Sequence, residues 1–553
     1  MDIASAVRQS QQQAGFDSHL NYDEITTLPD ILQQAVERYG DAPALTSVGH
    51  TISYRQLNQL ASRFAAWLQQ RTELQPGDRL AVQLPNLSQY SIVAYGALKA
   101  GLVLVNVNPM YTETELRYQF EHAEVKAVVV FDQCMRGIEV VAKQIPLQHI
   151  IIVSPFDLHA GWKRTVMNSL LKLSGKVGRP TLAHHRLADI LMLKDLKDAA
   201  PIERSSEDMA VLQYTGGTTG VSKPAVLSHH NLVSNMLQSW AGLSLANIEK
   251  GTEKMVAPLP MYHIYSFALV ITVGVYFGSH TLLIPDPRNI NALVKQLKKF
   301  HFSVLSGLNT LFSALLKHPH FDEIDFSGVK IITSGGMALT EGVATEWQQR
   351  TGVAICEGYG LTETSPVIAV TPANAVVAGS VGLILPETEV RVVDSEEQDV
   401  LAGEHGELWV RGPQVMKGYW KFPEETRKVL TDDGWFKTGD ITSIDRSGYL
   451  RIHDRKKDMI LVSGFNVYPN EIEGLLSTHP DITYCAAIGV DDPESGEVVK
   501  VFVVSTNPAL TTEQVRQYCR QSLASYKVPK LVEFRKELPL SNVGKVLKKE
   551  LRG

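Results

Sequence analysis

The run Tyr214-Thr-Gly-Gly-Thr-Thr-Gly-Val-Ser-Lys223 contains three glycines, three threonines and one lysine. Glycine permits backbone conformations in which successive N–H groups point into one concavity. The hydroxyl groups of Thr215, Thr218 and Thr219 add hydrogen-bond donors, and the ammonium of Lys223 adds a positive charge. This combination predicts a loop that holds a polyphosphate. An ordinary glycine- and threonine-rich surface turn is the alternative, because short motifs also occur by chance.

The residues around the lysine distinguish this loop from a Walker A loop. Ser222 precedes Lys223 and Pro224 follows it, whereas a Walker A lysine follows glycine and precedes serine or threonine. Proline fixes φ and has no N–H group, so the sequence alone does not define the backbone geometry at Pro224, where the loop ends.

Seven further segments follow in a defined order. They are Pro260–His263, Ser334–Gly336, Glu357–Glu363, Lys437–Asp440, Asp454–Asp458, Ser463–Pro469 and Asn542–Lys545. Together with the glycine-rich run they resemble the adenylate-forming superfamily of acyl-CoA synthetases, adenylation domains and luciferases. Within it, Leu461–Glu473 and Tyr526–Arg535 are most similar to bacterial long-chain fatty acid–CoA ligases. The resemblance runs from about residue 25 to the C-terminus, and it differs at Pro224, where the family usually has glycine.

The expected fold class is α/β. A chain of 553 residues is too long for one compact core, so at least two domains are expected. Buried-strand patterns such as Arg79–Leu84 and Lys126–Phe131 alternate with helical patterns such as Tyr54–Gln70, which favours α/β layers. The resemblance implies a large adenylate-forming domain over residues 1–454, with a β-rich subdomain, and a small mobile α+β domain over residues 455–553. The hinge is expected near Lys457.

The resemblance implies a two-step reaction. A fatty acid reacts with ATP to give acyl-AMP and pyrophosphate, and the acyl group then passes to coenzyme A. ATP, Mg²⁺ and coenzyme A are the implied cofactors. Lys545, Lys223 and His263 are the implied catalytic residues, and Thr215 and Glu363 the implied metal ligands. The expected ATP- and AMP-binding residues are Thr215, Gly216, Gly217, Thr218, Thr219, Gly220, Lys223, Gly335, Gly336, Glu357, Gly358, Tyr359, Gly360, Thr362, Asp440, Arg455 and Lys545.

The acyl and coenzyme A sites follow from the same resemblance. His263, Tyr265 and Phe267 are expected at the acyl pocket, and Ser463, Gly464 and Phe465 along the coenzyme A path. The stretch from 264 to 277 contains no acidic residue that could pair with the ammonium of an amino acid, which favours an unsubstituted apolar acid. Any single aromatic side chain here is equally consistent with core packing.

The composition of the chain argues against several classes of protein. The net charge of −6 gives no global affinity for nucleic acid. The four cysteines are scattered without metal-ligand spacing, which is typical of a cytosolic protein. The start, Met1-Asp-Ile-Ala-Ser5, has no basic or apolar stretch, so we expect no secretory signal. The apolar run 267–277 is shorter than the roughly 18 residues of a membrane span. We therefore expect a cytoplasmic protein.

Residues 158–186 form an unusual segment, because they contain six lysines and arginines and no acidic residue. At helical spacing, Trp162, Val166, Leu170, Leu173 and Val177 lie on one side, and Arg164, Asn168, Lys172 and Lys176 on the other. This pattern predicts peripheral contact with the cytoplasmic face of the inner membrane. A helix packed on its own protein with a solvated basic face is an equal alternative, and a mobile loop is a third.

Other functions stay open. A fatty acyl-AMP ligase is one, although 459–473 lacks an evident insertion after the hinge. A medium-chain or aryl acid–CoA ligase is another, and a non-catalytic acyl-binding sensor, supported by Pro224 alone, is a third. The sequence does not define the acyl chain length, and it leaves a homodimer open.

Overall fold

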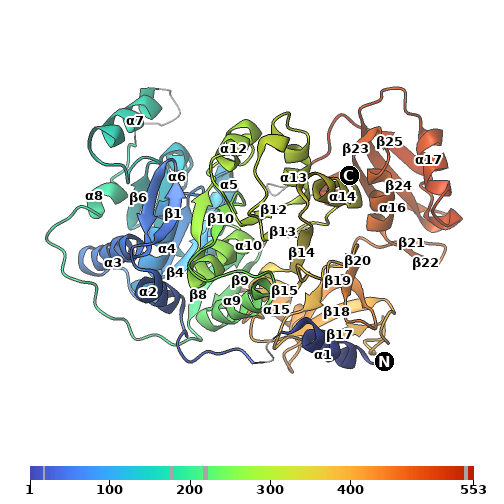
Figure 1. The fold of residues 1–553 in the computed structure, drawn as a ribbon, viewed down its shortest axis with the longest axis horizontal. Coiled ribbons are helices and arrows are strands. Elements are labelled where there is room, and N and C mark those ends of the chain that lie inside the picture. The colour runs from blue at the N-terminus through green and yellow to red at the C-terminus, as the bar shows by residue number, and fades with distance from the viewer. Residues whose placement is uncertain (17–18, 174–179, 216–221, 541–545, 553) are drawn as a thin grey trace.

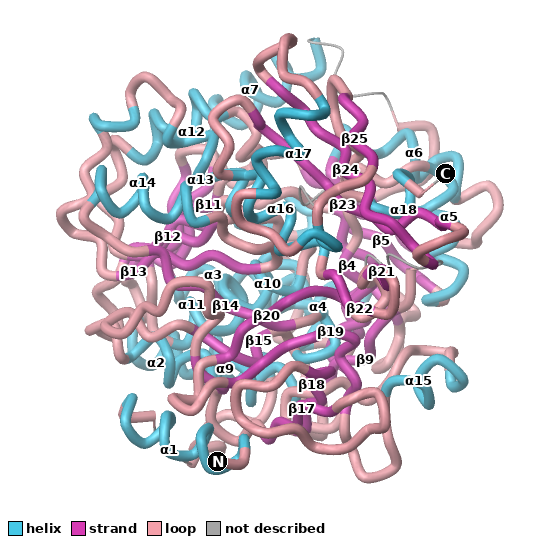
Figure 2. Tube along the Cα trace, turned by 90° about the vertical axis from the view of Figure 1, so that its right-hand side faces the viewer, coloured by secondary structure: helices cyan, strands magenta, loops and turns pink. Residues whose placement is uncertain are grey.

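The structure is a computed structural model in which residues 1–16, 19–173, 180–215, 222–540 and 546–552 are described. It is a mixed α/β protein with a large N-terminal part and a small C-terminal part (Figure 1). Figure 2 views the molecule from the side of the small part, with β23, β24 and β25 above β18, β19 and β20.

Two largely parallel sheets form the centre of the large part. The seven-stranded sheet has the order β7 (His185–Arg186), β6 (His149–Val153), β5 (Val125–Phe131), β3 (Arg79–Gln83), β4 (Val103–Asn106), β8 (Met209–Tyr214), β9 (Pro224–Ser228). The nine-stranded sheet has the order β16 (Leu383–Ile384), β15 (Val367–Val370), β14 (Ile355–Gly360), β13 (Ile331–Gly335), β12 (Val304–Gly307), β10 (Lys254–Ala257), β11 (His280–Leu283), β1 (Pro43–Ser47), β2 (His50–Ser53). Antiparallel strands lie at the sheet ends.

Alternating side chains divide these sheets into faces with separate cores. Leu80 and Val82 of β3 belong to the core that joins both sheets, whereas Ala81 belongs to the core on the outer face. The central core includes α2 (Leu28–Tyr39), α3 (Tyr54–Arg71), α4 (Ser88–Lys99), α9 (His229–Ser244), α10 (Ile264–Phe267), the π-helix η2 (Ala268–Val273) and α11 (Gly274–Tyr276). The period of two along each strand thus produces layers of helix, sheet, helix, sheet and helix.

The outer layers cover the remaining face of each sheet. The seven-stranded sheet packs against α5 (Glu113–Ala123) and α6 (Met135–Val141). The nine-stranded sheet packs against α12 (Ile290–Leu297), α13 (Asn309–Leu316) and α14 (Glu341–Thr351). The short α8 (Leu187–Ile190) and the exposed α7 (Gly161–Leu173) lie beyond β6 (Figure 1).

A β-rich region follows the two sheets. Its four strands are antiparallel, in the order β17 (Glu389–Val393), β18 (Gly406–Arg411), β19 (Phe436–Ile444), β20 (Leu450–Arg455). Helix α1 (Ile3–Ala14) packs against β17, and α15 (Pro423–Val429) connects β18 to β19. The β-rich subdomain that the sequence predicted is therefore present.

The C-terminal part has its own sheet and core. The sheet has the order β22 (Phe465–Val467), β21 (Ile460–Val462), β24 (Gly496–Ser505), β23 (Ile482–Asp492), and β25 (Leu531–Phe534) pairs with β24. Its helices are α16 (Pro469–Ser477), α17 (Thr512–Arg520) and α18 (Lys548–Leu551). Its cores begin at Ile460, whereas the core of the large part ends near Ile452. The boundary at 454 and the hinge at Lys457 stay predictions.

The first strand residues after the glycine-rich loop pair with a distant segment. The carbonyl of Pro224 accepts a hydrogen bond from the N–H of Trp420 at 2.9 Å, and the N–H of Val226 donates to the carbonyl of Gly418 at 2.9 Å. Pro224 is the first residue of β9, the last strand in the order of its sheet, and the first residue of a strand tolerates proline. The end of the loop thus continues into a strand that pairs with β8 on one side and with residues 417–420 on the other.

Local sequence explains several elements well. The helix predicted over 54–70 is α3, which begins with a capping box between Ser53 and Gln56. The predicted apolar run 267–277 forms the buried helices α10, η2 and α11. In the part of the chain that the structure describes, no helix has the length and apolar character needed to cross a membrane.

Gly360→Ala tests how tightly β14 is packed. A Cβ at Gly360 would lie 1.7 Å from the carbonyl oxygen of Pro366, and neither backbone can move independently. We expect a destabilisation of about 1–3 kcal/mol, as for other overpacked positions, seen as a lower melting temperature in circular dichroism. Gly358→Ala is the matched control, because its Cβ would have no neighbour closer than 3.9 Å. Equal melting temperatures for the two variants would contradict the packing described.

Candidate nucleotide and acyl site

The predicted segments gather where parallel strands end. The glycine-rich loop follows β8, the segment 260–263 follows β10, Gly335 ends β13, and Gly360 ends β14. These strands belong to the parallel portions of the two sheets. In open α/β sheets, ligands bind beyond the carboxyl ends of the strands.

Tyr359, Asp440 and Arg455 form one contact group. The hydroxyl of Tyr359 donates to Oδ2 of Asp440 at 2.5 Å, and Nε of Arg455 lies 2.8 Å from Oδ1 of the same carboxylate. Asp440 on β19 and Arg455 on β20 are direct cross-strand partners, which fixes the ion pair through the backbone register. Burial, and then the charge of Asp440, raises the pKa of Tyr359 well above its usual value. The hydroxyl therefore stays protonated as a donor.

Lys223, Tyr419 and Glu363 form a second group. The ammonium of Lys223 lies 4.9 Å from the centroid of the Tyr419 ring, and the hydroxyl of Tyr419 donates to Oε1 of Glu363 at 2.6 Å. Nζ of Lys223 is also 2.8 Å from Oε2 of Glu425 on α15. Sequence reasoning missed Tyr419 and Glu425, because they are about 200 residues from Lys223 and belong to no recognisable spacing pattern.

Glu363 and Thr215 are the residues expected to hold Mg²⁺. Glu363 lies in the 3₁₀ turn η4 (Thr362–Thr364), which packs against β9, and the N–H of Thr215 donates to the carbonyl of Lys223 at 2.9 Å. Over the described ranges, no three His, Cys, Asp or Glu side chains could enclose a metal ion. One carboxylate fits Mg²⁺, which is usually held by one or two carboxylates together with substrate phosphates.

Glu357 is a carboxyl group with little polar support. The N–H of Leu339 is 3.3 Å from its Oε2. Burial raises the pKa of Glu357 to about 7, because a charged carboxylate loses hydration there. Its position beside Gly358 and Tyr359 at the end of β14 places a carboxyl group of raised pKa, which can carry a proton near neutral pH, in the predicted adenine region.

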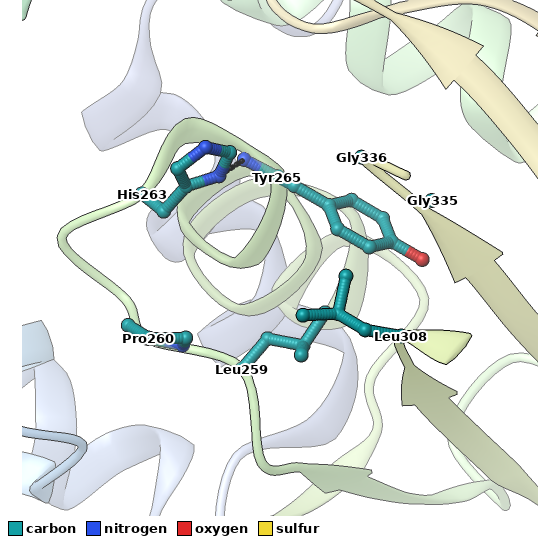
Figure 3. A pocket seen from close by; sticks show the side chains of 7 residues that line it. All are labelled: Leu259, Pro260, His263, Tyr265, Leu308, Gly335 and Gly336. Atoms are coloured by element: carbon teal, nitrogen blue, oxygen red, sulfur yellow. Dashed lines mark hydrogen bonds between the residues drawn. The ribbon is translucent and has the colours of Figure 1, made fainter. Parts of the chain in front are cut away.

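A small cavity of about 30 Å³ joins the predicted acyl and nucleotide segments. Its lining residues are Leu259, Pro260, His263, Tyr265, Leu308, Gly335 and Gly336 (Figure 3). The Tyr265 hydroxyl lies 3.0 Å from Oγ1 of Thr333, which holds the ring against Gly335. A Cβ at Gly335 would come within 3.3 Å of that ring, so glycine permits the close approach. The cavity thus unites His263 and Tyr265 with the Gly335-Gly336 pair.

Some predicted residues lie elsewhere. Phe267 is completely buried in the central core and does not line this cavity, so its role in the acyl pocket stays a prediction. Gly216, Gly217, Thr218, Thr219, Gly220 and Lys545 lie outside the described residues.

The segment expected along the coenzyme A path is a tight hairpin. Ser463 and Gly464 have φ values of 50° and 85°, as a two-residue turn between β21 and β22 requires. Phe465 follows with an exposed fraction of 57% and stacks on Tyr526 at 4.9 Å between ring centroids. The turn therefore presents an aromatic surface to solvent.

Comparisons with known proteins show the family of the chain. Residues 32–420 match the AMP-binding enzyme family, and residues 471–545 match the AMP-binding enzyme C-terminal domain. A long-chain-fatty-acid–CoA ligase of Escherichia coli O157:H7 is 43% identical, covering 97% of this chain and 96% of the relative. A ligase of the same name from Bacillus subtilis (strain 168) is 37% identical, covering 95% and 94%.

Solved structures agree as well. The ATP-bound MatB of Rhodopseudomonas palustris is 31% identical with a TM-score of 0.81, covering 95% of this chain and 98% of that one. The fold and site define an adenylate-forming enzyme. The chain belongs to the AMP-binding enzyme family.

The raised pKa of Glu357 predicts a pH-dependent stability. A carboxyl group whose pKa is higher in the folded chain takes up a proton on folding, so its contribution is present at low pH and is lost as the pH rises towards 7. Between pH 5 and pH 8, the free energy of unfolding of the wild type should fall by about 2 to 3 kcal/mol relative to Glu357→Gln. Denaturant unfolding at both pH values measures this difference.

Glu341→Gln, at an exposed position at the start of α14, is the matched control. If wild type and Glu357→Gln keep a constant difference over this range, Glu357 is not a buried carboxyl group of raised pKa.

Proposed function

We propose that the protein activates a fatty acid with ATP, releasing pyrophosphate, and transfers the acyl group from AMP to coenzyme A. The observation that carries this proposal is the cavity shared by His263, Tyr265 and Gly335-Gly336, which adjoins the Tyr359–Asp440 group on the neighbouring strand. The carboxyl end of an apolar acid and the nucleotide would meet beside this cavity, whose volume of about 30 Å³ holds no more than about one water. The relatives named long-chain-fatty-acid–CoA ligases support an acyl chain as the substrate.

In the first step, the residues offset negative charge. A carboxylate must approach a triphosphate, so cations and hydrogen-bond donors must surround the reacting oxygens. Lys223 supplies a charge at the β- and γ-phosphates, Thr362 contacts the α-phosphate, and Asp440 accepts from the ribose hydroxyls. Glu363 and Thr215 would hold Mg²⁺, which would supply electrostatic stabilisation of negative charge on the phosphate oxygens of ATP.

Tyr359 and the 335–336 backbone position the adenine. The hydroxyl of Tyr359 donates a hydrogen bond to Asp440, so the carboxylate keeps its orientation towards the ribose. Lys545 of the C-terminal domain then holds the substrate carboxylate against the α-phosphate. Its ammonium brings the two reacting groups together and offsets their negative charge. In the second step this domain turns near Lys457, and the Ser463–Phe465 hairpin faces the thiol.

Pyrophosphate release tests the reaction. With ATP and Mg²⁺, an acid alone should release pyrophosphate, and thioester should form only when coenzyme A is added. A panel of acids from C4 to C18 would give the chain length. Thioester formation without pyrophosphate release, or no release with any acid, would contradict the proposal, and release without transfer to coenzyme A would favour an acyl-AMP ligase.

The substitution Lys545→Ala tests the two steps of the reaction separately. It should abolish pyrophosphate release but keep thioester formation from pre-formed acyl-AMP and coenzyme A, because Lys545 acts on the carboxylate in the first step. Equal losses in both assays would contradict this division of roles. Lys549→Ala, four residues further along the chain, is a matched control for charge removal.

We also propose that α7 contacts an anionic membrane surface reversibly. Its apolar side chains face outwards: the exposed fractions are 72% for Trp162, 55% for Leu170 and 83% for Leu173. Single exposed apolar residues are common, but a row of them at helical spacing marks a contact surface. The helix lies at the outer edge of the molecule (Figure 1).

The polar residues of α7 hold it to the protein. Arg164 lies 3.2 Å from Asp189, and the side-chain amide of Asn168 donates to Asp157 at 3.0 Å. Arg164 and Asn168 therefore turn towards the protein, which argues against the alternative of a helix that packs on its own protein and leaves its basic face solvated. The Lys172 side chain and all of Lys176 lie outside what the structure describes. The basic composition of 158–186 complements anionic lipid.

Vesicle sedimentation tests this contact. Trp162→Ala with Leu170→Ala should weaken binding to vesicles of anionic lipid by about ten-fold or more, because both side chains lose buried apolar area. High salt should weaken it as well. Leu401→Ala is a matched control, since Leu401 is 59% exposed on the β-rich region. Binding that is unchanged by the paired substitution would leave α7 without this role.

A further inference from the structure

Glu425 forms an ion pair with Lys223, the residue whose ammonium is expected to bind the phosphates. Oε2 of Glu425 is 2.8 Å from Nζ of Lys223, and the two side chains are 32% and 22% exposed. The other carboxylate oxygen, Oε1, contacts the ammonium of Lys428. Each oxygen of Glu425 thus has a cation of its own.

The position of Glu425 is fixed by the backbone and not by Lys223 alone. Residues 417–420 pair with β9, which brings Tyr419 beside Lys223. The hydroxyl of Thr426 accepts from the N–H of Tyr419 at 2.9 Å and donates to the carbonyl of Phe422 at 2.9 Å. This bond attaches the start of α15 to the strand, so Glu425 stays near Lys223 whether or not they are paired.

A phosphate group and the Glu425 carboxylate would compete for the same ammonium. Both are oxyanions that accept charge-assisted hydrogen bonds. When a triphosphate binds Lys223, the Glu425 carboxylate either gives up this contact or shares the ammonium, and in both cases it lies next to a like charge. When pyrophosphate leaves, the carboxylate can return. The face of Tyr419 lies beneath the ammonium, and its hydroxyl donates a hydrogen bond to Glu363.

We propose that Glu425 is a resident counter-ion of Lys223, which weakens binding of MgATP and of pyrophosphate and so promotes release of the product. The inference rests on the proposed function for the role of Lys223. Glu425 is a positioning residue, because it acts on the phosphates through Lys223.

The test is Glu425→Gln, which keeps the size of the side chain and removes its charge. Titration calorimetry should show that MgATP and inorganic pyrophosphate bind about two- to five-fold more tightly, the range for a partly exposed ion pair. The KM for ATP should fall by the same factor without a rise in kcat, since product release becomes slower. Glu424→Gln is the matched control: Glu424 is adjacent and 77% exposed, and it pairs with Arg427.

A double-mutant cycle separates this role from a structural one. In a Lys223→Met background, Glu425→Gln should leave the affinity for pyrophosphate unchanged, because the cation through which it acts is gone. Weaker or unaltered binding in the single variant would overturn the proposal. Equal tightening in both backgrounds would overturn it too, since general charge removal would then suffice.

These measurements distinguish failure of this inference from failure of the proposed function. If the wild type turns over an acid and Glu425→Gln changes neither affinity, this inference alone fails. If the wild type binds neither MgATP nor pyrophosphate and turns over no acid, both proposals fail.

Discussion

The backbone pairing between β9 and residues 417–420 is the interaction on which the phosphate end of the site depends. It joins a strand that follows the glycine-rich loop to a segment about 200 residues later. Through it, Tyr419 stands between Lys223 and Glu363, and α15 begins close enough for Glu425 to reach the lysine. Without this pairing, the cationic and anionic groups would belong to two separate surfaces.

The end of the site that is expected to bind adenine depends on the burial of two side chains of β14. Tyr359 and Glu357 are neighbours on β14, and burial raises the pKa of both side chains. A nucleobase binds well beside groups that can hold a proton and form hydrogen bonds, because a protonated group loses less hydration free energy on burial than a charged one. The charged residues Asp440 and Arg455, in contrast, neutralise each other through a paired register on adjacent strands.

Sequence patterns predicted the elements whose signals are local. The period of α3 and the alternation in β3 and β5 are visible in a few residues, and so are the motifs at the ends of β13 and β14. The resemblance assigned Tyr359, Asp440 and Arg455 to one nucleotide site. The structure brings the three side chains into contact, and their roles towards the nucleotide stay predictions. Contacts between distant segments could not be predicted from the sequence, because they depend on tertiary packing. Examples are the approach of Tyr419 and Glu425 to Lys223, and the inward direction of Arg164 on α7. A helical pattern shows which residues share a side, but not which side faces the protein.

The register of β19 and β20 has a consequence for the lifetime of an intermediate. Arg455 is two residues before Lys457, yet its partner Asp440 is fixed across the strand by the backbone. A turn of the C-terminal domain near Lys457 would begin just beyond this pair and leave it whole. The ribose could then remain attached while the acyl group waits for its thiol, so the adenylate need not leave the protein between the two steps.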